Sequence, residues 1–106
     1  MNQSKSSKIV ELILSGCQPK KIILFGSQAR GTSTLGSDID IMIILDHVAD
    51  RRSQMVNIRR LLLPLGGRVD VLVVTEKTFE EWHETPGNIY FEAAQDGQVL
   101  FDEKAA

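Results

Sequence analysis

The sequence is poor in several features that would point to a particular class of protein. Of its 106 residues only Cys17 is a cysteine, so neither an internal disulfide nor a cysteine-based metal cluster can form. Twelve basic residues against fourteen acidic ones give a net charge of -2, whereas nucleic-acid-binding domains are usually strongly basic. No apolar run approaches the roughly 20 residues of a membrane-spanning helix. We therefore expect a cytoplasmic globular protein that does not enter a membrane, and its charge does not favour nucleic acid as the partner.

The length sets a second limit. A chain of 106 residues can bury one hydrophobic core, but it is too short for a catalytic domain together with a dedicated substrate domain. We expect residues 1–106 to form a single domain. Whatever it acts on must fit that one unit or be brought by a partner.

Apolar periodicity and turn residues predict alternating helices and short strands. The expected strands are 21–25, 38–45, 68–74 and 98–101, and the expected helices are 7–16, 50–63, 78–84 and 88–95. This order predicts an α/β or α+β domain in which helices cover a small central sheet.

The segment FGSQARGTSTLGSDID, residues 25–40, carries more acidic charge than a loop requires. Side chains alternate along a strand, so Asp38 and Asp40 would project from one face, roughly 6 to 7 Å apart. A third carboxylate, Asp70, interrupts the apolar run RVDVLVV. If the two strands pair, the three carboxylates converge, and oxygen-only ligands select Mg²⁺ or Mn²⁺. Such a triad can hold two metal ions. One would activate an attacking hydroxyl group, and the other would bind the phosphates of a nucleotide.

The glycine and serine before the aspartates are suited to binding a phosphate. Gly26 permits a sharp turn and a close approach, while the backbone amide and hydroxyl of Ser27 can donate hydrogen bonds. Arg30 could reach the same triphosphate or pair with a carboxylate, and the sequence leaves both readings open. Ser27 could also cap a helical turn.

Gly26, Ser27 and then Asp38-Ile39-Asp40 resemble the signature of the DNA polymerase beta-like nucleotidyltransferase superfamily. The form GSQARG followed by SDIDIMI, in so short a chain, resembles its minimal members, the MntA-like antitoxins found beside HEPN-domain proteins. The resemblance implies a small mixed β-sheet flanked by helices, a Gly-Ser turn that holds the triphosphate, and two metals on Asp38 and Asp40. It also implies that Asp70 completes the catalytic metal site and helps to deprotonate the acceptor.

The reaction implied by this resemblance is nucleotidyl transfer. A hydroxyl attacks the α-phosphorus of a nucleoside triphosphate, expected to be ATP, and pyrophosphate leaves. In the MntA-like group the acceptor is a tyrosine of a HEPN toxin, which is silenced by AMP. Two alternatives stay open: a non-catalytic module that occludes its partner, and a transferase acting on RNA or a small molecule.

Other side chains have less specific readings. The three aspartates could simply be capping or solvent-facing residues. The arginines between positions 51 and 60 could dock RNA or an acidic partner, although such residues more often form a solvated face. Trp82, Tyr90 and Phe91 are interpreted as core or partner-interface residues rather than a base-stacking platform.

Overall fold

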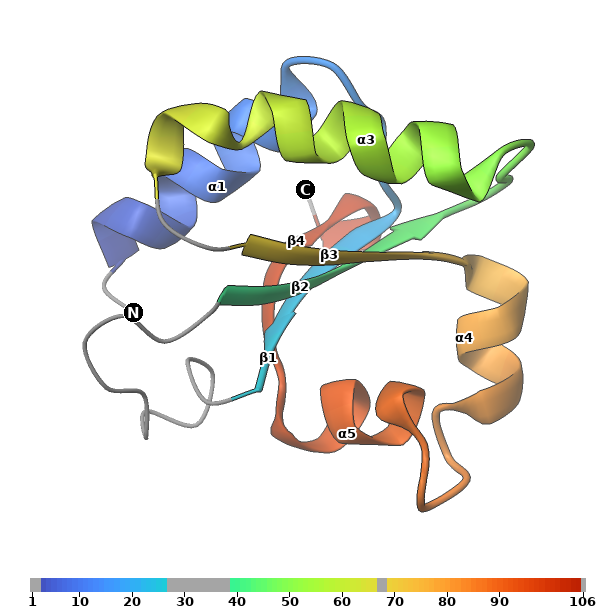
Figure 1. The fold of residues 1–106 in the computed structure, drawn as a ribbon. Helices are drawn as coiled ribbons and strands as arrows, with labels where there is room; N and C mark the ends of the chain where they lie inside the picture. Colours follow the sequence, from blue (N-terminus) through green and yellow to red (C-terminus); the bar gives the residue numbers. More distant parts are fainter. Residues whose placement is uncertain (1–2, 27–38, 67–68, 106) are drawn as a thin grey trace.

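The structure is a computed structural model that describes residues 3–26, 39–66 and 69–105. Within these ranges four α-helices and four β-strands follow one another in the order that the sequence predicts (Figure 1). The strands are β1 (Lys21–Phe25), β2 (Ile39–Leu45), β3 (Val69–Thr75) and β4 (Gln98–Asp102). The helices are α1 (Gln3–Leu14), α3 (Arg51–Leu61), α4 (Glu76–Trp82) and α5 (Ile89–Asp96), with short 3₁₀ turns η1 (Leu63–Leu65) and η2 (Glu103–Ala105).

The strands form one mixed sheet in the order β3-β2-β1-β4. β1 is antiparallel to both of its neighbours, whereas β2 and β3 are parallel and are joined through α3. The parallel pair is the feature that matters for function, because it aligns the beginnings of β2 and β3 at the same end of the sheet.

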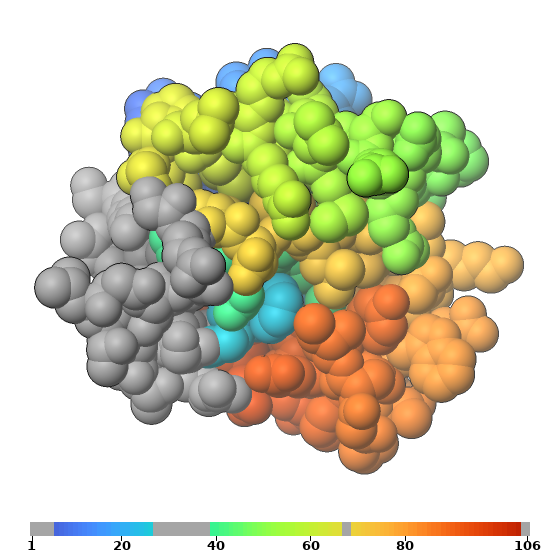
Figure 2. Space-filling view, viewed as in Figure 1, coloured from blue at the N-terminus to red at the C-terminus, as the bar shows by residue number. Residues whose placement is uncertain are grey.

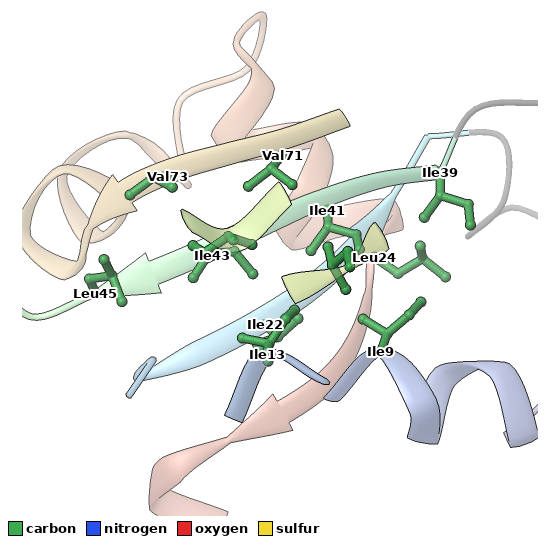
Figure 3. Close-up of a cluster of buried hydrophobic side chains, with 12 residues drawn as sticks. Ile9, Ile13, Ile22, Leu24, Ile39, Ile41, Ile43, Leu45, Val71 and Val73 are labelled. Atoms are coloured by element: carbon green, nitrogen blue, oxygen red, sulfur yellow. The ribbon is translucent and has the colours of Figure 1, made fainter. Parts of the chain in front are cut away.

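Helices cover both faces of this sheet, so its central strands are apolar on both sides. α1 and α3 form the layer above the sheet, and α4 and α5 lie below it (Figure 1). The upper cluster includes Ile41 and Ile43 of β2 together with Ile9 and Ile13 of α1 (Figure 3). The lower cluster consists of Ile23, Phe25, Met42, Ile44, Val74, Phe79 and Ala93. This two-sided burial explains why β2 reads as a continuous apolar run after Asp40.

Side-chain caps fix where three helices begin. Asp50, Thr75 and Asn88 accept hydrogen bonds from the backbone N–H three residues ahead, on Ser53, Thr78 and Phe91 respectively. The sequence prediction for α4 started at residue 78 and was late, because Thr75 caps the helix. Hydrogen bonding to Ser53 also lowers the pKa of Asp50.

The aromatic residues divide between the two expected environments. Tyr90 packs against the lower cluster. Trp82 is 46% exposed at the end of α4, so of the two expected environments the core is excluded for it, and a place in a partner interface stays a prediction. No helix in the described ranges is long and apolar enough to cross a bilayer.

Candidate active site

Asp40 and Asp70 are brought together by the parallel pairing of β2 with β3. Each is the second residue of its strand, and they are direct register partners. Neighbouring strands lie about 4.8 Å apart, and aligned residues project from the same face, so the two carboxylates stand side by side. The strand pairing on which the sequence prediction for Asp70 depended is present, and it sets Asp70 beside Asp40.

The face on which they lie is the one covered by α4 and α5. Met42 and Ile44 follow Asp40 at intervals of two along β2, and both belong to the lower cluster. The aspartates occupy the end of this face, beyond the apolar residues. Asp70 is exposed and Asp40 is half-buried, so a ligand can reach both carboxylates from solvent.

Gly26 closes the site on the β1 side. Its φ of 79° lies in the left-handed region, which side chains other than glycine adopt at a cost. A Cβ at this position would collide with Oδ2 of Asp40. The glycine is therefore required twice, once by its backbone angle and once by the carboxylate packed against it. This contact places the glycine turn next to the carboxylates, as the candidate phosphate site requires.

The sequence analysis missed Phe25. It is the antiparallel register partner of Asp40, so a row of three side chains, Phe25, Asp40 and Asp70, crosses the sheet on one face. Phe25 is 8% exposed and belongs to the lower cluster. Its position directly before Gly26 was the available signal.

Three of the predicted site residues, Ser27, Arg30 and Asp38, lie outside the described residues. Within the part of the chain that the structure describes, no group of three potential metal ligands is gathered. The described half of the site comprises Gly26, Asp40 and Asp70. Its oxygen-only donors suit a hard divalent cation such as Mg²⁺.

The sheet reaches the surface at this region of the molecule. Figure 2 shows a hollow in which atoms of β1, β2 and β3 are visible between α3 above and the α4 and α5 segment below. The opening leaves room for a substrate at the sheet itself.

Another cavity, of about 180 Å³, lies at the opposite end of the strands. Its lining includes two lysines that already face carboxylates: Nζ of Lys20 is 3.0 Å from Glu103, and Nζ of Lys21 is 3.8 Å from Asp102. The hydrogen bond and charge of Glu103 raise the pKa of Lys20. Because these two lysines are neutralised within the chain, this cavity is a weaker candidate for a triphosphate than the aspartate end.

The chain is similar to known proteins both in sequence and in fold. Residues 5–104 match the family described as "Nucleotidyltransferase domain". A Methanocaldococcus jannaschii protein named "Putative protein adenylyltransferase" is 37% identical over 82 residues, which cover 77% of this chain and 78% of that protein.

Two solved structures share the fold. One is a toxin-antitoxin crystal structure with AMP-PNP, with a TM-score of 0.70 and 21% identity over 94% of this chain and 75% of that chain. The other contains a tri-AMPylated HEPN toxin of Shewanella oneidensis in complex with MNT antitoxin. That match has a TM-score of 0.65 and 19% identity, and it covers 99% of this chain and 76% of the other.

Proposed function

Because the chain belongs to the nucleotidyltransferase domain family, we propose that it transfers AMP from ATP to a hydroxyl group of a partner protein. The observation that carries this proposal is the register pairing of Asp40 with Asp70 beside the glycine turn at Gly26. The turn offers backbone amides to a triphosphate, and the carboxylates offer oxygen ligands to the cations that accompany it.

The proposed chemistry is a single displacement at phosphorus. The acceptor oxygen forms a bond to the α-phosphorus, the bond from that phosphorus to the bridging oxygen breaks, and pyrophosphate leaves with the bond electrons. The acceptor proton passes to Asp70, the more exposed carboxylate of the pair. Mg²⁺, held by Asp38, Asp40 and Asp70, would supply charge neutralisation and a more acidic acceptor hydroxyl. Ser27 and Arg30 would bind the triphosphate oxygens.

The acceptor is proposed to be a tyrosine of a HEPN-type toxin, which makes the chain an antitoxin. Two similarities support this choice: the relative named as a protein adenylyltransferase, and the fold shared with complexes of HEPN toxins. A single small domain acting on a partner that presents the hydroxyl also fits a chain of 106 residues. We also propose that residues 1–106 form this single domain.

The test is label transfer from α-labelled ATP in Mg²⁺, with and without the protein encoded beside this gene, read by mass spectrometry. We expect AMP-sized mass gains on a tyrosine of that protein. Asp40→Asn and Asp70→Asn should each lower the rate by about 100-fold or more, because each removes charge stabilisation of the transition state.

The matched control is Asp46→Asn, which removes an exposed carboxylate just beyond the other end of β2. It should leave the rate unchanged. Undiminished transfer by the Asp40→Asn variant would exclude the role proposed for Asp40. Absence of transfer by the wild type would exclude the enzyme and leave an occluding antitoxin. Label found on RNA instead of protein would replace the proposed acceptor.

A further inference from the structure

The outer face of α3 is strongly basic. The helix carries four arginines and no acidic residue, and all four arginines are exposed: Arg51, Arg52, Arg59 and Arg60. Among the described residues, the ion pairs involve Lys20 and Lys21 but none of these arginines. No ion pair within that part of the chain takes up their charge, so it can attract another molecule.

The opposite layer of the molecule has the opposite charge. α4 and α5 together carry five acidic residues and a single basic one, Lys77. The sheet separates the two layers, so the chain is basic on one side and acidic on the other although its net charge is only -2 (Figure 1). An acidic partner would be attracted to the α3 side and repelled from the other.

Four residues of α3 fall on one side of the helix. Arg52, Val56, Arg59 and Arg60 are spaced at i, i+4, i+7 and i+8, and we call them the α3 stripe. Val56 is 50% exposed between the arginines, and a shallow groove runs past Arg52, Val56 and Arg60. An exposed apolar residue flanked by cations suits a protein segment with acidic and apolar side chains better than a nucleic-acid backbone.

The stripe is also well placed with respect to the candidate active site. α3 joins two parallel strands, so it runs antiparallel to them and its last turn lies toward the start of β3, where Asp70 stands. Figure 2 shows α3 above the hollow on the same face of the molecule. A segment lying along the stripe would continue toward the carboxylates.

We propose that the α3 stripe docks an acidic segment, with apolar side chains, of the protein whose hydroxyl group is modified. This inference rests on the proposed transfer to a protein acceptor and names the surface that delivers it. The stripe supplies recognition, and the aspartate end of the sheet supplies the chemistry.

The test uses a random copolymer of glutamate and tyrosine, which combines acidic charge, aromatic rings and a hydroxyl acceptor. Its binding to the full chain is measured by fluorescence anisotropy without ATP. The triple variant Arg52→Gln/Arg59→Gln/Arg60→Gln keeps good helix formers and should bind the copolymer about tenfold more weakly, with a reduced dependence on salt.

The control is Lys8→Gln/Lys77→Gln/Lys104→Gln, which removes the same charge from exposed positions away from the stripe. It should bind as the wild type does. Equal loss in both variants, or no loss in the stripe variant, would overturn the docking proposal. So would tighter binding of single-stranded RNA than of the copolymer, lost in the stripe variant.

Binding and transfer can fail separately. Absence of AMP transfer by the wild type, with stripe-dependent binding intact, would remove the proposed function alone. Stripe-independent binding together with Mg²⁺-dependent transfer would remove the docking surface alone.

Discussion

At the scale of single residues, Gly26 determines both the backbone turn after β1 and the space beside the Asp40 carboxylate. Its positive φ turns the chain out of β1, and its missing Cβ leaves the space that the Asp40 carboxylate occupies. Gly87 shares the first property, with φ of 95°, but a Cβ there would meet no heavy atom within 4 Å. The two glycines therefore separate the effect of strain from that of contact with Asp40.

We expect Gly26→Ala and Gly87→Ala both to lower the free energy of unfolding, by about 1 to 2 kcal/mol from the left-handed backbone alone. Gly26→Ala should lose more, because its Cβ also displaces Asp40. Urea denaturation with transfer assays checks this prediction. Gly87→Ala should keep full activity and Gly26→Ala should lose it, and equal behaviour of the two variants would contradict the role given to the contact.

Part of the candidate site was predictable from the spacing of residues in the sequence. Alternation along a strand and a carboxylate inside an apolar run were enough to select Asp40 and Asp70. Their direct register was not predictable, because the length of the α3 connection does not fix how β2 and β3 align. Phe25 was missed for the same reason: its neighbour on β2 depends on antiparallel register across a long loop.

At the scale of elements, the order of helices and strands followed from periodicity, while their boundaries depended on caps. β1 was predicted with its observed bounds, since Gly26 ends it. α4 begins two residues earlier than predicted because the hydroxyl of Thr75 accepts from the N–H of Thr78, at 3.2 Å. α3 ends at Leu61 and Pro64 falls in η1, so the proline follows the helix end without forming it.

Asn88 joins α4 to α5, so its loss should loosen the lower layer. Its Oδ1 accepts from the N–H of Phe91 at 2.9 Å, and its Nδ2 donates to the carbonyl oxygens of Thr85 and Trp82, at 2.7 and 3.2 Å. Asn88→Ala removes all three and should cost about 1 to 2 kcal/mol of stability.

Asn88→Asp provides the comparison, because a carboxylate keeps the cap but cannot donate to the two carbonyls. Its stability, measured by thermal unfolding, should fall between those of the wild type and the alanine variant. A variant Asn88→Asp as stable as the wild type would show that the two donated hydrogen bonds contribute nothing.

At the scale of the whole molecule, one sheet connects two hydrophobic clusters. Ile43 of β2 belongs to the upper cluster and Met42, its neighbour in the chain, belongs to the lower one. Both are fully buried. Neither layer can lose its packing without exposing the strand that supports the other.

We therefore expect one cooperative unfolding transition that both clusters share. Ile43→Ala and Met42→Ala should each lower the free energy of unfolding by about 2 to 5 kcal/mol. The chain's one tryptophan, Trp82, lies in the lower layer, so its fluorescence reports on that layer while far-ultraviolet circular dichroism reports on the whole chain. Coincident transitions are expected for both variants. If Ile43→Ala left the unfolding transition measured by Trp82 fluorescence unchanged, the two layers would unfold independently.

The sheet order has a consequence for synthesis on the ribosome. β1 pairs with β2 on one side and with β4 on the other, yet of the four described strands β4 emerges last. The strand that precedes Gly26 and the two that carry Asp40 and Asp70 can thus assemble first, while β1 keeps an open edge. An open edge strand is a template for pairing with other chains, so the nascent protein is most prone to misassociation during this interval. Addition of β4 removes this open edge of β1.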